Sequence, residues 1–330
     1  MAVISGVGLD VGTMNLVAAR SEEGSVISGR LRNAFLDLPA ANKRMLKISN
    51  TSFIEMDGHL LVIGDEALET ANLFDREARR PMSGGIMSSG EIDGQRVIAV
   101  MLKHLLGAPK SDLEKCVYSV PAPALDVNGS DITYHSKILE RIISELGYKA
   151  EAINEALAII YSECAKTSFS GLGISFGSGM TNVCLAYNAM SVLEFSVGRG
   201  GDWIDAGASK AVGTTAAKIC TIKESGLDLM NPKSRQEEAL AVYIENLIDY
   251  VIDNTIKQFS KSKNQISINK PLPIVISGGT SLAKGFLEKF QTRFEKYRSS
   301  FPVTVSEFRH ATDPMSAVAT GLLVLAQMDD

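Results

Sequence analysis

The sequence predicts an α/β protein in which two similar halves face each other across a shared cleft. Its 330 residues are too many for one ordinary hydrophobic core and suit two. A strand, a glycine-rich turn and a second strand are predicted around Gly8, and the same pattern returns at Gly173, half a chain later. Between the two copies, segments with helical spacing alternate with short apolar strands.

The first half is predicted to begin with two strands and to continue with helices. Val3–Leu9 is apolar and β-branched, and Leu16–Ala19 is the returning strand after the turn GLDVGT. Apolar spacing predicts helices over Arg96–Leu106 and Ile132–Leu146, with CVYSVPAP as a buried strand between them. Residues 31–80 interrupt this order, so we expect them to form a small inserted subdomain.

The second half repeats the strand-turn-strand pattern after one helical segment. Helical spacing covers Glu151–Thr167, and GISFGSGMTNVCLAY then predicts a strand, a glycine-rich turn and a strand. A long helix is predicted over Glu237–Ser260, inside a second insertion at residues 206–269. Ile274–Ser277 is predicted to be a further buried strand.

The predicted division is lobe I at residues 1–150 and lobe II at 151–312. We expect a closing helix at 313–328 to pack back on lobe I. No segment is apolar over the ~20 residues that a membrane-spanning helix needs. The N-terminus lacks the basic region of a signal peptide. These features favour a soluble cytoplasmic protein, with membrane association doubtful.

Charge and cysteine content exclude several other classes. The net charge of -5 provides no basic surface for the phosphates of nucleic acid, so direct binding to DNA or RNA is not expected. The four cysteines are scattered without a CxxC pair, which argues against a zinc site or a disulfide framework.

The turn at Gly8–Asn15 has residues that suit a phosphate. Gly12 lets backbone N–H groups approach phosphate oxygens without a Cβ in the way, and Thr13 and Asn15 add side-chain donors. Asp10 ends the strand and can hold a divalent cation through its water shell, as Mg²⁺ prefers. Taken alone, such a turn is more typical of an ordinary hairpin than of a phosphate site.

Two further elements strengthen the phosphate hypothesis. The second turn, GSGMT, repeats the chemistry with Gly177 and Gly179 as permissive positions and Ser178 and Thr181 as donors. The segment Val275–Phe286 predicts a buried strand that ends at a glycine pair, followed by a helix that starts near Thr280 or Ser281. A helix N-terminus suits the sugar and α-phosphate of a nucleotide.

In order and spacing, these three motifs resemble the actin, heat-shock ATPase and sugar-kinase superfamily, and the greatest likeness is to bacterial MreB and MamK-type actins. The resemblance covers nearly the whole chain in collinear order. It implies an actin-like ATPase fold with two ribonuclease H-like mixed five-stranded sheets around a nucleotide cleft. The stretches that carry it beyond the three turns are VIGDEA, RRPMSGGIM, VGRGGDWID, GTTAAKI and DPMSAVATGLL.

The resemblance also implies roles for individual residues. Asp10 would help to hold Mg²⁺, and Lys218 would lie near the ribose or the purine of ATP or ADP. Glu155 matches the position of the residue that orients the attacking water, and a carboxylate there can accept the proton of that water. The residues that would line the phosphates and the adenosine are Gly12, Thr13, Met14, Asn15, Gly177, Ser178, Gly179, Thr181, Gly278, Gly279, Thr280 and Ser281.

One departure from the family pattern concerns hydrolysis. The second turn normally opens with an aspartate, and here that position is Ser175. Losing one preorganised contact of this kind costs on the order of 10²–10³ in turnover. We therefore expect ATP to bind well and to be hydrolysed slowly or in an altered manner.

The expected function is that of a cytoskeletal ATPase that polymerises head to tail in a nucleotide-dependent way. Adaptor proteins are additional expected partners. Two alternatives stay open on the sequence: a non-hydrolysing nucleotide-binding adaptor, which Ser175 favours, and a small-molecule kinase of the same superfamily. A chaperone-like ATPase is disfavoured because no peptide-binding segment follows Asp330.

Overall fold

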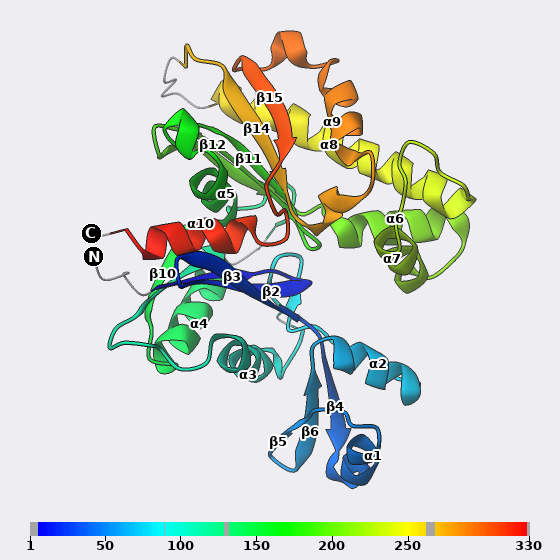
Figure 1. Ribbon diagram of the computed structural model, residues 1–330. Coiled ribbons are helices and arrows are strands. Elements are labelled where there is room, and N and C mark those ends of the chain that lie inside the picture. The colour runs from blue at the N-terminus through cyan, green and yellow to red at the C-terminus, as the bar shows by residue number, and fades with distance from the viewer. Residues whose placement is uncertain (1–5, 89, 129–131, 262–267, 329–330) are drawn as a thin grey trace.

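The computed structural model describes residues 6–88, 90–128, 132–261 and 268–328, which form two α/β lobes stacked one above the other (Figure 1). Lobe I contains a five-stranded sheet in the order β10-β9-β1-β2-β3. Its antiparallel part is β1 (Gly6–Val11), β2 (Asn15–Glu22) and β3 (Ser25–Arg32). Two strands extend it in parallel, β9 (Lys115–Val120) and β10 (Lys149–Asn154).

Lobe II repeats this sheet in the order β13-β12-β11-β14-β15. Its antiparallel part is β11 (Gly171–Phe176), β12 (Thr181–Tyr187) and β13 (Met190–Val197), and its parallel part is β14 (Leu272–Ser277) and β15 (Val305–His310). Both sheets therefore have three antiparallel strands followed by two parallel ones. This confirms the predicted fold class of two related mixed five-stranded sheets.

Helices cover the outer faces of both sheets and build the small subdomains. Lobe I carries α3 (Gly94–Leu106) and α4 (Ile132–Glu145), whereas lobe II carries α6 (Gly201–Val212), α7 (Ala216–Glu224), α8 (Arg235–Lys261) and α9 (Phe286–Phe294). Below lobe I, a three-stranded sheet is flanked by two helices (Figure 1). Its elements are β4 (Phe35–Pro39), α1 (Lys43–Ile48), β5 (Ile54–Met56), β6 (His59–Ile63) and α2 (Asp65–Leu73).

Two helices fill the space between the lobes. α5 (Glu155–Glu163) and α10 (Ala317–Ala326) pack against each other, and α10 also packs on β1 and β9 (Figure 1). Their small side chains form a separate buried cluster with Val117 of lobe I and Val275 of lobe II. Close approach needs glycine here: a Cβ added at Gly321 would lie 1.8 Å from the carbonyl oxygen of Ala158. The connection between the lobes is therefore tightly packed.

Two sequence-based predictions about local structure are wrong. The helix expected from Glu151 begins only at Glu155, because residues 149–154 form β10 beside β9, and the Asn154 side chain caps α5 by accepting from two backbone N–H groups. The α-helix expected near Thr280 is a 3₁₀ turn over Gly279–Leu282, and α9 starts at Phe286. The predicted residues Val3 to Ser5 lie outside the described part of the chain. None of the described helices is long and apolar enough to cross a membrane.

We predict that Gly321→Ala destabilises the protein. Alanine favours a helix over glycine by about 1 kcal/mol, but the clash with the Ala158 backbone requires α10 or α5 to move, and such overpacking costs typically 1–3 kcal/mol. The melting temperature should fall by several degrees. Gly29→Ala is the control, because its new Cβ would have no neighbour closer than 3.5 Å. Equal melting temperatures for both variants would contradict this account of the interface.

Candidate functional site

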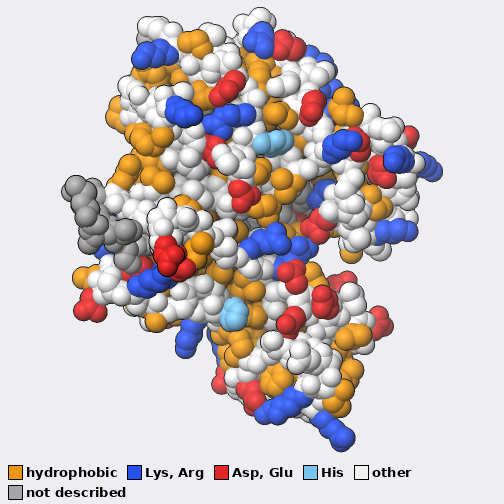
Figure 2. Space-filling model, in the orientation of Figure 1, with side chains coloured by type: hydrophobic (Ala, Val, Ile, Leu, Met, Phe, Trp, Pro, Cys, Tyr) orange, Lys and Arg blue, Asp and Glu red, His pale blue; other side chains and the backbone are white. Residues whose placement is uncertain are grey.

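A cavity of about 580 Å³ lies between the two lobes. Its volume is in the range of pockets that bind small molecules and cofactors. Both predicted turns contribute to its lining, as do the glycine pair after β14, the C-terminal end of α7 and the segment before α10. The space-filling view shows a deep notch in the surface between the upper lobe and the small subdomain (Figure 2).

The first turn joins β1 to β2 and is closed by one backbone hydrogen bond. The N–H of Gly12 donates to the carbonyl oxygen of Asn15 at 3.0 Å, and a Cβ at Gly12 would lie 2.8 Å from that oxygen. Asn33, the residue after β3, supports the turn by donating its side-chain N–H to the carbonyl of Gly12. Glycine is therefore required at the position where the backbone faces the cavity.

The second turn has the same geometry in lobe II. The N–H of Gly177 donates to the carbonyl oxygen of Met180 at 3.1 Å, and a Cβ at Gly177 would lie 2.8 Å from it. The start of α6 holds this turn, because the N–H groups of Gly201 and Asp202 donate to the carbonyls of Gly177 and Ser178. Those two N–H groups are consequently not free to bind a ligand.

The two turns touch each other. A Cβ added at Gly179 would lie 2.4 Å from Thr13 Oγ1 and 2.3 Å from the backbone nitrogen of Gly85. Thr13 Oγ1 in turn accepts a hydrogen bond from that nitrogen at 3.0 Å. One ligand can therefore contact the turns of both lobes at once.

The third predicted element lies next to the second turn. Gly278 follows β14 with φ of 91°, and a Cβ there would lie 2.4 Å from the carbonyl oxygen of Phe176. Thr280 Oγ1 donates to the carbonyl of Gly177 at 3.0 Å. The glycine pair is thus fixed against the second turn by close packing and by a hydrogen bond.

Most of the site residues predicted from the sequence line this one cavity. They are Asp10, Gly12, Thr13, Met14, Asn15, Glu155, Gly177, Ser178, Gly179, Gly278, Gly279 and Thr280. Ser175, where the resemblance leads us to expect an aspartate, lines it as well.

Three predicted residues do not line the cavity. The side chain of Thr181 is buried and donates to the carbonyl of Arg199, and the hydroxyl of Ser281 is buried and donates to the carbonyl of Gly278. Lys218 lies on the exposed first turn of α7. The end of that helix, Lys223 and Glu224, lines the cavity instead.

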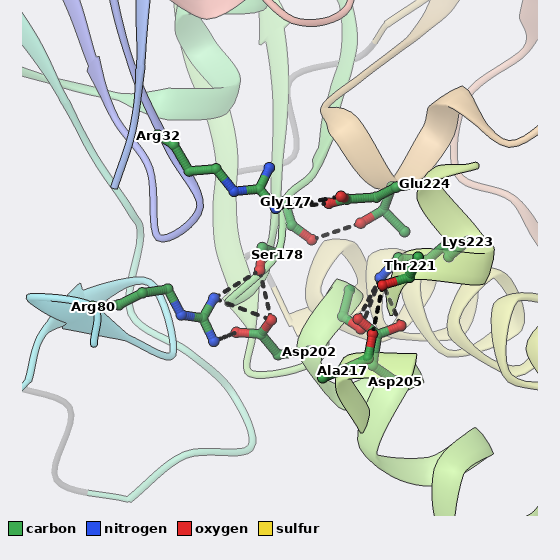
Figure 3. Close-up of polar contacts among 12 residues, drawn as sticks. Arg32, Arg80, Gly177, Ser178, Asp202, Asp205, Ala217, Thr221, Lys223 and Glu224 are labelled. Carbon is green, nitrogen blue, oxygen red and sulfur yellow. Dashed lines mark hydrogen bonds and ion pairs between the residues drawn. The ribbon is translucent and has the colours of Figure 1, made fainter. Parts of the chain in front are cut away.

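Sequence reasoning missed the charged side chains at the cavity mouth. Lys223 Nζ donates to both carboxylate oxygens of the buried Asp205, at 2.7 and 2.8 Å. Arg32 from β3 of lobe I reaches Glu224 of lobe II, with Nη2 at 3.3 Å from the carboxylate (Figure 3). Arg30 and Lys284 also line the cavity. Lys223 lies five positions after Lys218, just beyond the stretch GTTAAKI that carries the resemblance, so no predicted motif included it.

Two carboxyl groups face the inner part of the cavity, one from each side. Burial raises the pKa of Asp10 to about 6, while the hydroxyl of Ser119 donates to its carboxylate at 2.9 Å and opposes the shift. Burial and the charge of Asp10 raise the pKa of Glu155 to about 8, and a hydrogen bond from Ser175 opposes this. The side-chain N–H of Asn182 donates to Glu155 Oε2 at 2.8 Å.

This pair of carboxyl groups suits a divalent cation whose remaining coordination positions are filled by other ligands. Two carboxyl groups in a desolvated site repel each other when both are ionised, and a cation between them relieves the repulsion. In the described residues, no group of three or more His, Cys, Asp or Glu side chains could form a metal cage. A cation here would thus draw its remaining ligands from water and from ligand oxygens, as Mg²⁺ does with phosphates.

Comparison with known proteins gives a consistent result. The Volactin family profile matches residues 6–326. A MamK double helical filament superposes with a TM-score of 0.72 at 17% identity over 99% of both chains. MreB 5 of Spiroplasma citri bound to AMPPNP superposes at 0.68 with 14% identity, over 97% of this chain and 95% of that one. The ethanolamine utilization protein EutJ from Carboxydothermus hydrogenoformans reaches 0.57 at 12% identity, over 97% and 89%. No match was found among curated protein sequences.

We predict that the Glu155 carboxyl lowers stability as the pH rises. Its pKa increases from 4.5 to about 8 on folding, so the native state holds the proton more tightly than the unfolded state and loses stability across that interval. Without nucleotide and divalent cations, Glu155→Gln should gain melting temperature relative to the wild type between pH 4.5 and about 8. Glu151→Gln, on the exposed face of β10, is the control. A difference in melting temperature between Glu155→Gln and the wild type that stays constant across this pH interval would contradict the raised pKa.

Proposed function

The chain belongs to the Volactin family, an actin-like family, and we propose that it binds ATP between its lobes, hydrolyses it slowly and assembles into filaments. The observation that carries the proposal is the contact between the two glycine turns at one cavity, with Gly179 against Thr13. Two opposed glycine-rich turns can hold a ligand with several phosphates in a row from both sides. MreB 5 and a non-polymerising MamK mutant have structures with AMPPNP bound, and MreB 5 also with ADP.

The cavity has a phosphate end and a nucleoside end. At the inner end, backbone N–H groups of both turns, with the hydroxyls of Thr13 and Ser178, would bind the β- and γ-phosphates. Towards the mouth, the carboxylate of Glu224 can accept hydrogen bonds from ribose hydroxyls. Leu227 and Met315 provide apolar surface for the base beside the Gly278–Gly279 pair.

Mg²⁺ would be held by Asp10 through water molecules and by phosphate oxygens. When bound, the ion neutralises charge on the phosphates and draws both carboxyl groups towards ionisation. Glu155 would then accept the proton of the attacking water, while the side-chain amide of Asn182 fixes the orientation of its carboxylate. Ser119 orients Asp10 in the same way from β9.

Ser175 explains why hydrolysis should be slow. Its hydroxyl binds Glu155, so it stabilises the water-orienting group, but it adds no negative charge for the cation. An aspartate there would place a third carboxyl next to Asp10 and Glu155. That arrangement would hold Mg²⁺ more tightly and position the leaving phosphates better.

Assembly is the second part of the proposal. The MamK relative is a double helical filament, and the present chain matches it over its full length. A nucleotide that contacts both lobes binds the closed conformation more tightly than the open one, and so it favours closure. Closure in turn aligns the surfaces that contact the next subunit. Head-to-tail contacts that do not close into a ring produce a filament. A cytoplasmic location follows from this cytoskeletal role.

We predict that Glu155→Gln separates binding from hydrolysis. The variant keeps the hydrogen bond to Asn182 but cannot accept a proton, so phosphate release should fall by roughly 10²–10⁴-fold. Affinity for ATP should change by less than about threefold, because backbone N–H groups make most phosphate contacts. Phosphate release and titration with a fluorescent ATP analogue measure the two quantities. An unchanged rate would remove Glu155 from the mechanism.

Ser175→Asp should act in the opposite direction. We expect tighter Mg²⁺ binding and a turnover increase of up to about 10²-fold, because the variant restores one preorganised carboxylate. Ser175→Ala is the control, because it removes the hydroxyl without adding a carboxylate. A wild-type turnover that is already fast, and that the substitution leaves unchanged, would show that Ser175 does not limit hydrolysis.

The second candidate function is a non-hydrolysing nucleotide-binding adaptor, which Ser175 favours. Light scattering and electron microscopy with ATP, with ADP and without nucleotide distinguish it from the polymerising ATPase. We expect filaments with ATP and fewer or none without nucleotide. A chain that binds ATP but stays a monodisperse monomer under all three conditions would support the adaptor.

A further inference from the structure

A short hairpin from lobe I contacts both phosphate turns. It consists of β7 (Met82–Ser83) and β8 (Ile86–Met87), with Gly84 and Gly85 at its tip. Gly85 lines the cavity and donates its N–H to Thr13 Oγ1 at 3.0 Å. On its other side the tip packs against Gly179 so closely that no Cβ fits there. The hairpin is therefore positioned where the terminal phosphate of a nucleotide would be bound.

The side chain of Arg80, two positions before this hairpin, reaches lobe II. Arg80 forms a two-point ion pair with Asp202 at the start of α6, with Nη2 at 3.1 Å from Oδ2 and Nη1 at 3.2 Å from Oδ1 (Figure 3). Both side chains are about one third exposed, 34% and 33%. The pair lies behind Ser178, outside the set of cavity-lining residues.

Ser178 connects this ion pair to the cavity. Its hydroxyl donates to Asp202 Oδ1 at 2.8 Å, and Arg80 Nη1 lies 3.5 Å from its oxygen. A serine hydroxyl has one proton to donate. As long as Asp202 accepts that proton, Ser178 cannot offer it to a phosphate oxygen in the cavity.

The negative charge of Asp202 disfavours a phosphate nearby, and the positive charge of Arg80 compensates for it. The carboxylate of Asp202 lies one hydrogen bond behind the turn that would contact the terminal phosphate, and two anions so close repel each other. The guanidinium of Arg80 cancels the charge of Asp202 and offers it two hydrogen bonds. Asp202 can then release the proton of Ser178 without being left as an unpaired anion.

We propose that Arg80 is a positioning residue that sets the preference of the site for a nucleoside triphosphate over a diphosphate. It acts through Asp202 and Ser178 and does not touch the nucleotide. The proposal rests on the proposed function, because it assumes that Ser178 faces the phosphate which ATP has and ADP lacks. The chemical group that is recognised is a terminal phosphate of a triphosphate.

The neighbouring arginine is a matched control. Arg79 belongs to the same segment and has the same charge, but its guanidinium lies 4.6 Å from the centre of the Phe35 ring and pairs with Glu91 and Asp93 of lobe I. Arg79→Ala therefore removes one positive charge from the segment without releasing Asp202.

The test compares the affinities of the full chain for AMPPNP and for ADP, both with Mg²⁺, by competition with a fluorescent nucleotide. Arg80→Ala should weaken AMPPNP binding roughly five- to tenfold more than ADP binding, and the difference should shrink at high salt because the exposed charge is then screened. Asp202→Asn should keep or increase the preference for AMPPNP. Adding Asp202→Asn to Arg80→Ala should restore it to within about threefold of the wild type.

Several outcomes would overturn the proposal. Equal losses for AMPPNP and ADP in Arg80→Ala would show a merely structural role, and so would a double variant that does not recover. The same change in preference for Arg79→Ala would show a general charge effect. If Arg80→Ala does not fold, a reduced preference in Asp202→Asn alone would contradict the charge argument. A wild-type chain that binds neither nucleotide would overturn the proposed function itself, and this inference with it.

Discussion

The direct contact between two glycine turns, one from each lobe, is the constraint on which the rest of the structure depends. Gly179 can meet Thr13 and Gly85 only because no Cβ stands between them, and this contact places both turns on one cavity. The lobes are held in that relation by α5 and α10, where Gly321 allows an equally close approach to Ala158. Substitution at either place would separate the halves of the site.

Electrostatics at the inner end of the cavity follow from this closeness. Asp10 on β1 and Glu155 at the start of α5 are brought together in a desolvated space, so the pKa of each carboxyl is raised. Hydroxyl and amide groups compensate for the missing water: Ser119 donates to Asp10, and Asn182 to Glu155. Such a site favours the binding of a cation, which suits a Mg²⁺–nucleotide complex.

The sequence predicted the fold class and most cavity residues because these depend on local patterns. Apolar strands and glycine turns indicated which backbone segments line the cavity. The errors fall where local signals are ambiguous: residues 151–154 have helical spacing but are taken up by β10, because pairing with β9 outweighs propensity. Lys218 and Lys223 lie on one helix, and only its packing shows which of them faces the cavity.

By itself, the sequence determined that two similar α/β halves exist, and it located the three glycine-rich turns. Only the tertiary structure decided which groups from distant segments meet. The ion pair of Arg80 with Asp202 and that of Arg32 with Glu224 join residues more than a hundred positions apart in the chain. Their formation depends on how the lobes pack, because a side-chain contact across a cleft leaves no periodic pattern in the sequence.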